Sequence, residues 1–285
     1  MTVELDVFNK ESGKLKGNFV NTENHSIYYE EASNSSETKQ TIIVSHGACA
    51  TGRYMNLIAL ALLDSIPNTK VIVLDLPFHG ESTTSLSLEG VTVHDYTAYT
   101  EEFLHKLKGN GVLEGAVTWL GWSMGGSIGL LLTKEDTLLD NLVLVNSSSC
   151  WESVEGLVTL FTDNSSNKEV FKHIVLESLQ GESQELISKI STSYDEITSS
   201  GEVIQADFNA ILPKHYDLRE TLQGVETPTL IFSGTSDNVA ELGYQHHLAD
   251  NIPNSEIVLV EDNHCTVLHP DKVVTLVSAV KNFIY

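Results

Sequence analysis

The sequence contains little cysteine and little positive charge. Its three cysteines, Cys49, Cys150 and Cys265, are an odd number and lack the short spacings of metal-binding pairs. They argue against a disulfide scaffold and against a zinc site. Lys and Arg together number 16 against 39 Asp and Glu, which gives a formal net charge of −23. Because such a surface repels nucleic acid and anionic lipid, we expect neither as a partner.

Long apolar runs and a targeting segment are also missing. No run reaches membrane-spanning length, and residues 1–16 are polar, without the apolar core of a signal peptide. We therefore expect no membrane span and a cytoplasmic location. A length of 285 residues with 41% hydrophobic residues is enough for an α/β domain with a large buried core.

The most informative stretch of the sequence surrounds a serine between two glycines. An apolar run at residues 116–120 leads into the pentapeptide Gly-Trp-Ser-Met-Gly at 121–125, and small and apolar residues follow at 127–132. Strand, sharp turn and helix form the context in which Gly-x-Ser-x-Gly marks a nucleophile elbow. The glycines lack a Cβ atom, so strand and helix can pass closely around a strained serine. Ser123 is the predicted nucleophile; the alternative is a structural Gly/Ser turn.

Apolar runs alternate with helical patterns along most of the chain. The runs lie at 41–45, 71–74, 116–120, 142–145, 229–233 and 256–260, and the helical patterns at 54–63, 93–107, 241–248 and 271–283. Such runs, apolar on both faces, are typical of a parallel sheet with helices on both sides. An N-terminal hairpin is predicted from segments 17–21 and 26–30. Together these patterns predict a doubly wound α/β fold.

The strand rhythm stops between residues 147 and 213. Helical spacing dominates there, and polar clusters at 163–167 and 198–201 interrupt it. We interpret 147–213 as a helical cap, inserted between a first core segment at 1–146 and a second at 214–285.

Aromatic side chains supply candidates for a substrate pocket. Trp151, Phe161, Phe171 and Phe208 belong to the predicted cap, and Trp122 precedes the predicted nucleophile. Each of them taken singly is more typical of plain core than of a substrate contact.

Polar residues follow the predicted strands, at the sheet edge where open α/β sheets bind their ligands. A serine nucleophile needs a base, and the base needs a partner that fixes its tautomer. Ser123, Asp237 and His264 supply these three groups in the order Ser…Asp…His found in α/β-hydrolases.

Three positions compete as the partner of His264. Asn146 cannot carry the charge that stabilises an imidazolium, and Asp262, two residues before His264, would have to curl back along its own loop. Asp237 follows a neighbouring strand, from which a carboxylate reaches the distal ring nitrogen. We therefore predict Asp237.

Four other polar residues near strand ends are interpreted as structural. His46 and His79 are predicted to pack loops, and Asp75 to brace its own loop. His269 precedes a proline at the start of the last predicted helix.

With these motifs the chain resembles the α/β-hydrolase superfamily, from about residue 17 to the C-terminus. It is most similar to the small bacterial serine hydrolases that include pimeloyl-carrier-protein methyl ester esterase, carbon–carbon bond hydrolases and cofactor-free peroxidases. The resemblance is carried by His-Gly at 46–47, Asp-Leu-Pro-Phe-His-Gly-Glu-Ser at 75–82, the elbow, Gly-Thr-Ser-Asp at 234–237, and His264. It departs at Phe78, where many relatives carry glycine.

The resemblance implies a mostly parallel eight-stranded sheet with helices on both faces and a helical cap insertion. It implies that Ser123 is the nucleophile, His264 the general base and Asp237 the acid that orients it. The oxyanion hole would come from the backbone N–H groups of Ala48 and Met124. No cofactor and no metal are implied.

The predicted function is therefore that of a serine hydrolase, acting through a covalent acyl-enzyme on a small or medium carboxylic ester. One alternative is carbon–carbon bond hydrolysis or a perhydrolase reaction with the same triad. Another is a slow, ligand-sensing hydrolase that signals through a partner protein. The natural acyl and alcohol groups and the oligomeric state stay open.

Overall fold

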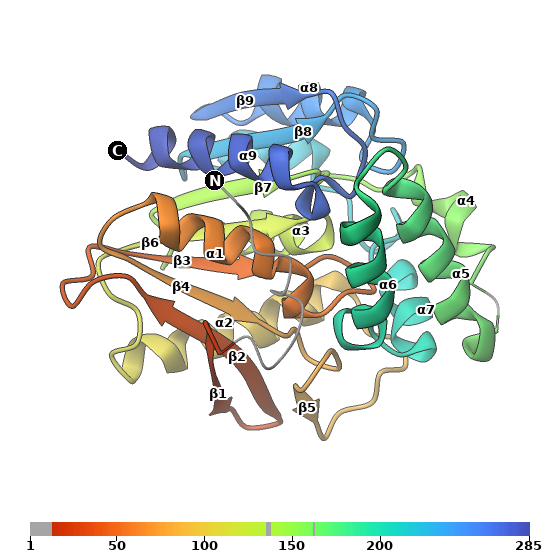
Figure 1. Cartoon of the computed structure of the whole chain (residues 1–285), viewed down its shortest axis with the longest axis horizontal. Coiled ribbons are helices and arrows are strands. Elements are labelled where there is room, and N and C mark those ends of the chain that lie inside the picture. Colours follow the sequence, from red (N-terminus) through yellow and green to blue (C-terminus); the bar gives the residue numbers. More distant parts are fainter. Residues whose placement is uncertain (1–12, 135–137, 162) are drawn as a thin grey trace.

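Nine strands form one mixed sheet in the computed structural model, which describes residues 13–134, 138–161 and 163–285 (Figure 1). The strands are β1 Lys16–Asn21, β2 His25–Ser33, β3 Gln40–Ser45, β4 Thr69–Leu74, β5 Thr83–Thr84, β6 Ala116–Trp122, β7 Asn141–Val145, β8 Thr229–Gly234 and β9 Ser255–Val260. Their order is β1-β2-β4-β3-β6-β7-β8-β9, and the short β5 pairs with β2. The continuous order thus contains the eight strands that were predicted, and the short β5 is a ninth.

The parallel part of the sheet is its buried centre. Neighbouring strands from β4 through β3, β6, β7 and β8 to β9 pair in parallel, whereas β2 pairs antiparallel with β1, β4 and β5. Every residue of β3 and β8 is buried. These strands are apolar on both faces because helices cover both sides. The doubly wound α/β fold and the N-terminal hairpin are confirmed.

Helices lie on both faces of this sheet. They are η3 Gly52–Met55, α1 Asn56–Ser65, α2 Val93–Gly109, α3 Met124–Leu132, α4 Val154–Val158, α5 Asn164–Ser178, α6 Gln184–Ile197, α7 Gly201–Ala210, η4 Arg219–Gly224, α8 Leu242–Asn251, η5 Thr266–Leu268 and α9 Pro270–Ile284. In Figure 1, α1 and α9 cover the face toward the viewer, and α2, α3 and α8 lie behind the sheet.

Between β7 and β8 the chain forms α4, α5, α6 and α7, which lie together beyond one end of the sheet, at the right of Figure 1. The polar clusters that interrupt this segment are helix starts. The Asp163 side chain caps α5 by accepting from the Ser165 N–H, and Ser200 caps α7 by accepting from the Val203 N–H. The division at residues 146 and 213 stays a prediction.

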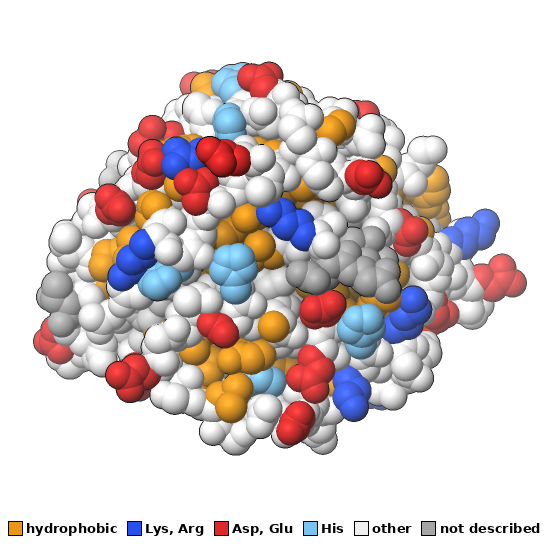
Figure 2. Space-filling model, turned by 180° about the vertical axis from the view of Figure 1, so that it is seen from behind, with side chains coloured by type: hydrophobic (Ala, Val, Ile, Leu, Met, Phe, Trp, Pro, Cys, Tyr) orange, Lys and Arg blue, Asp and Glu red, His pale blue; other side chains and the backbone are white. Residues whose placement is uncertain are grey.

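Acidic side chains are spread over the rear face of the molecule rather than gathered in one patch (Figure 2). Within the described ranges, no helix has both the length and the apolar character needed to cross a membrane.

Candidate active site

Ser123 occupies a strained turn between β6 and α3. Its φ of 52° and ψ of −121° lie outside the regions that side-chain-bearing residues usually adopt. A Cβ atom on Gly121 would come within 2.2 Å of the Gly125 carbonyl oxygen, and one on Gly125 within 2.5 Å of the His46 carbonyl oxygen. Both glycines are therefore required by close backbone approach, which is the geometry of a nucleophile elbow.

His264 and Asp237 reach this turn from the loops after β9 and β8. His264 Nε2 lies 3.0 Å from Ser123 Oγ, and His264 Nδ1 lies 2.8 Å from Asp237 Oδ2. The other carboxylate oxygen, Oδ1, accepts from the N–H groups of Val239 and Ala240, each at 2.8 Å. Because a carboxylate only accepts, Nδ1 carries the ring proton. His264 Nε2 is then free to accept the Ser123 hydroxyl proton.

The rival carboxylate, Asp262, binds a different histidine. Its two oxygens lie 2.7 and 2.9 Å from His269 Nδ1, and both side chains are buried. Burial lowers the pKa of His269, but the hydrogen bond and charge of Asp262 outweigh it and raise the pKa above its ordinary value. The structure therefore brings Asp237, and not Asp262, to the ring of His264.

Asn146, considered in the sequence only as a rival acid, holds the loop that carries His264. Its Nδ2 donates to the carbonyls of Asn263 at 2.9 Å and His264 at 2.8 Å, and its Oδ1 accepts from the Gly234 N–H at 3.0 Å. Trp122 Nε1 also donates to the His264 carbonyl, at 2.9 Å. In the sequence, the feature that points to this clamp is an amide side chain placed directly after an apolar run.

The two predicted oxyanion donors flank Ser123. Met124 is the first residue of α3, where a helix leaves its N–H groups unpaired and carries partial positive charge. Gly47, which precedes Ala48, lies so close that a Cβ atom on it would come within 2.8 Å of Ser123 Cβ. Among the residues that the structure describes, no hydrogen bond occupies either the Ala48 or the Met124 amide. Both amides are therefore unengaged beside Ser123, the predicted nucleophile.

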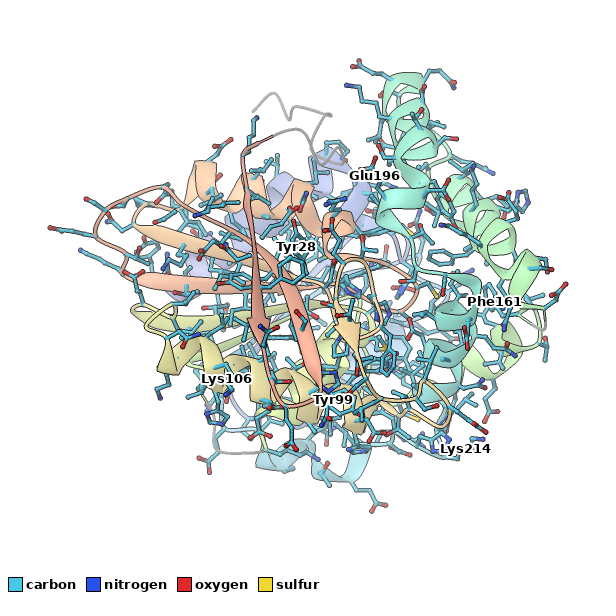
Figure 3. All side chains as sticks on the ribbon, turned by 90° about the horizontal axis from the view of Figure 1, so that it is seen from below. Tyr28, Tyr99, Lys106, Phe161, Glu196 and Lys214 are labelled. Atoms are coloured by element: carbon cyan, nitrogen blue, oxygen red, sulfur yellow. The ribbon has the colours of Figure 1, made fainter. Side chains whose placement is uncertain are left out.

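A cavity of about 440 Å³ opens over Ser123 and His264. Three of the predicted pocket residues, Trp122, Trp151 and Phe171, line it. Phe161, which is labelled in Figure 3, is not part of the lining and stacks on Phe208, with ring centroids 4.5 Å apart. Of these two stacked rings, Phe208 is the one that lines the cavity.

The wall of this cavity is mostly apolar. Further lining side chains from the segment between β7 and β8 are Val154, Leu157, Leu160, Ile174, Glu177, Ser178 and Ile211. Its ionisable side chains are Glu177, His264 and Cys265, and the described lining contains no Lys or Arg. The arrangement suits an apolar substrate group and offers no counter-ion to an anionic one.

The loops beneath the cavity are braced by the residues interpreted as structural. The Leu76 N–H donates to His46 Nε2 at 3.0 Å, and burial lowers the pKa of His46. Asp75 accepts from the Gly52 N–H at 2.6 Å and the Glu81 N–H at 2.8 Å, and burial raises its pKa to about 6. These bracing roles are confirmed. No group of three or more His, Cys, Asp or Glu within the described ranges is arranged to hold a metal ion.

Comparison with known proteins places the chain in a family. A model described as the alpha/beta hydrolase family matches residues 42–276. No curated protein matches the chain.

Similar solved structures include a hydrolase from Pseudomonas aeruginosa PA01, with 21% identity, a TM-score of 0.74 and coverage of 96% of this chain and 99% of that one. An enol-lactonase from Burkholderia xenovorans LB400 has 17% identity, a TM-score of 0.78 and coverage of 94% and 99%. The esterase EaEST from Exiguobacterium antarcticum has 22% identity, a TM-score of 0.77 and coverage of 93% and 100%. At these identities the likeness shows a shared fold. The family model, by contrast, matches most of the chain and shows its family. The chain is a hydrolase of the alpha/beta hydrolase family.

Proposed function

We propose that this hydrolase cleaves carboxylic esters through a covalent acyl-enzyme formed on Ser123. The observation that supports the proposal most strongly is the continuous hydrogen-bonded line from Ser123 through His264 to Asp237, with distances of 3.0 and 2.8 Å. Its serine end lies on the wall of the cavity. Nucleophile, base and orienting acid within hydrogen-bond reach are the signature of an activated serine.

In the first half of the reaction, Ser123 Oγ forms a bond to the ester carbonyl carbon while His264 Nε2 takes its proton. The carbonyl oxygen becomes an anion, which the N–H groups of Ala48 and Met124 stabilise. Asp237 stabilises the imidazolium through Nδ1. When the tetrahedral intermediate collapses, the bond to the alcohol breaks and His264 returns the proton to the leaving oxygen.

Water completes the cycle. It attacks the acyl carbon and gives a proton to His264, and a second oxyanion forms in the same place. The bond to Ser123 Oγ then breaks, the proton returns to this oxygen, and the carboxylic acid leaves. Each oxyanion donor contributes about 10²–10³ in kcat in enzymes where it has been removed.

The cavity supports an uncharged acyl group of small or medium size. Pockets of about 300–1,000 Å³ bind small molecules, and this one holds about 440 Å³ with no Lys or Arg in its described lining. The net charge of −23 disfavours an anionic substrate further. Because Leu160 and Phe171 contribute to the wall, we propose that residues 147–213 act as a cap that sets the choice of acyl chain.

A matched pair of substrates tests this function. We expect 4-nitrophenyl butyrate to be turned over many times, with a kcat/KM about tenfold or more above that of the equally short, anionic 4-nitrophenyl hemisuccinate. The Ser123→Ala variant should hydrolyse neither. Preference for the hemisuccinate would overturn the proposed acyl class. A single turnover followed by a stably modified protein would favour the ligand-sensing alternative.

A further inference from the structure

The loop that carries Ala48 is bound to the segment that joins α6 to α7. Ser199 N–H donates to the Cys49 carbonyl at 2.9 Å, and Thr51 N–H donates to the Ile197 carbonyl at 3.0 Å. Ser199 Oγ adds a bond to the Ala50 carbonyl, at 3.0 Å. In Figure 3, Glu196 is labelled close to where α6 meets the rest of the molecule. The residues after Ala48 therefore take their place from the inserted helices as well as from β3.

A buried carboxylate on α7 reinforces this attachment. Asp207 is fully buried, and three donors converge on it. Its Oδ2 accepts from the Cys49 N–H at 2.7 Å and from His79 Nε2 at 2.9 Å, and its Oδ1 accepts from the Tyr96 hydroxyl at 2.8 Å. Hydrogen bonds to a charged acceptor are the strong ones. Asp207 thus links the insertion to the loops after β3 and β4 and to α2.

The residue that Asp207 holds is strained. Cys49 has a φ of 70°, a left-handed conformation that a residue with a side chain rarely adopts. Such a conformation persists only where its surroundings impose it. The Cys49 N–H bond to Asp207 and the Cys49 carbonyl bond from Ser199 constrain this residue on both sides. The Cys49 N–H belongs to the planar peptide that joins Ala48 to Cys49, so its bond to Asp207 fixes the orientation of that peptide directly beside Ala48.

The charge state of the cluster suits this role. Burial lowers the pKa of His79, but the charge and hydrogen bond of Asp207, with a further contribution from Asp75, outweigh it and raise the pKa above its ordinary value. The pairing of His79 with Asp207, at 2.9 Å, offsets part of the cost of burying this carboxylate beside the Cys49 N–H.

We infer that Asp207 is a positioning residue for the hydrolase reaction: through the Cys49 N–H it holds the Ala48 amide toward the oxyanion, so that seating of the insertion on the core completes the oxyanion hole. The inference rests on the proposed function. It makes the α6–α7 half of the insertion a support of the reaction chemistry, whereas α4 and α5 supply much of the pocket wall.

The Asp207→Asn variant keeps the shape of the side chain but not its charge. Its NH₂ group can donate to the Tyr96 hydroxyl, but the single amide oxygen left for the Cys49 N–H and His79 Nε2 is neutral, so the bond that holds Cys49 is weakened. Small displacements of a catalytic group cost about 10²-fold in rate. We expect kcat per active site to fall about 10- to 100-fold while KM changes by less than about threefold, because an oxyanion donor acts in the transition state.

A control variant separates positioning from general loss of structure. Tyr96→Phe removes one hydrogen bond from the same carboxylate and leaves the bond from Asp207 to Cys49. Ser199→Ala removes an anchor of the loop itself. Fluorophosphonate end-point titration gives the fraction of active enzyme in each variant, and affinity for a trifluoromethyl ketone, whose adduct carries the oxyanion, reports the hole directly.

The inference predicts that Asp207→Asn and Ser199→Ala lower both kcat per titrated site and affinity for the trifluoromethyl ketone, and that Tyr96→Phe lowers neither. It is overturned if Asp207→Asn reduces only the titrated fraction, or if Tyr96→Phe shows the same loss. Should Asp207→Asn fail to fold, the comparison of Ser199→Ala with Tyr96→Phe decides. A wild-type protein with neither ester turnover nor labelling would refute the proposed function, whereas an active wild type with unaffected variants would refute this inference alone.

Discussion

Replacement of Asp237 by Asn tests how His264 is oriented, and the structure determines which way the new amide must face. Oδ1 of Asp237 accepts from the N–H groups of Val239 and Ala240, each at 2.8 Å. In Asp237→Asn the amide oxygen must keep this position, since an NH₂ group there would face two donors. The NH₂ group therefore takes the place of Oδ2, 2.8 Å from His264 Nδ1, and donates to it.

The consequence is the wrong tautomer. With Nδ1 accepting, the ring proton moves to Nε2, which then cannot accept the proton of Ser123. The expected loss in kcat is about 10⁴-fold, equivalent to about 5.4 kcal/mol of transition-state stabilisation at about 1.36 kcal/mol for each factor of ten. Steady-state hydrolysis of 4-nitrophenyl butyrate measures it, with circular dichroism to show that the fold is retained.

The matched control is Asp262→Asn, a change of the same kind at a carboxylate that binds His269. This variant should lose stability, because a buried hydrogen-bonded pair is disrupted, and should keep kcat within about threefold of wild type. A severe loss of kcat in Asp262→Asn, together with a near-normal kcat in Asp237→Asn, would refute the assignment of the orienting acid.

Three further substitutions test the loop clamp at Asn146, the ion pair of His79 and the wall of the cavity. Asn146→Gly tolerates the φ of 46° at this position but leaves the Gly234 N–H without its acceptor, so urea unfolding should show a loss of about 1–3 kcal/mol; an unchanged midpoint would contradict the clamp. The pKa of His79 lies above its ordinary value of 6.5 in the folded protein, so the stability that its pairing with Asp207 contributes is complete below pH 6.5 and is lost as the pH rises through the folded pKa. The thermal midpoint should therefore fall more steeply with rising pH in wild type than in His79→Gln, and equal slopes would argue against the ion pair. Phe171→Ala enlarges the cavity wall, so relative kcat/KM should move toward longer acyl chains by about tenfold in a chain-length panel; an unmoved preference would place the acyl pocket among the sheet-side loops.

Features of the fold that depend on neighbouring residues could be predicted from the sequence. The elbow at Ser123 depends on adjacent glycines and on the apolar strand before them, and the strand ends at Asp237 and His264 follow from apolar runs that stop abruptly. Turn chemistry was visible in the same way, since the polar clusters around Asp163 and Ser200 are helix caps.

Residues whose roles depend on distant partners could not be identified in this way. Asp207 lies 158 positions from Cys49 and 128 from His79 along the chain, and nothing beside it in the sequence points to either. Asn146 is a clamp because its amide meets a loop 118 positions away. The same holds for Phe161 and Phe208, since only tertiary packing decides which of two stacked rings lines a cavity.

The departure at Phe78 shows a conformational cost that a motif alone does not reveal. Its φ is 72°, in the left-handed region that a glycine adopts without strain. The ring lies edge-on to Tyr96, with centroids 6.3 Å apart. Packing of this kind offsets part of the backbone strain, which is typically about 1–3 kcal/mol for such a residue.

Locating the site of covalent modification is the most direct test of Ser123 as the nucleophile. After treatment with a fluorophosphonate, intact mass spectrometry should show one adduct per chain, and peptide mapping should place it on Ser123; Ser123→Ala should remain unlabelled and lose about 10⁶ in turnover. Labelling that persists in Ser123→Ala, or an adduct that maps to Cys265 on the cavity wall, would contradict the assignment of Ser123 as the nucleophile.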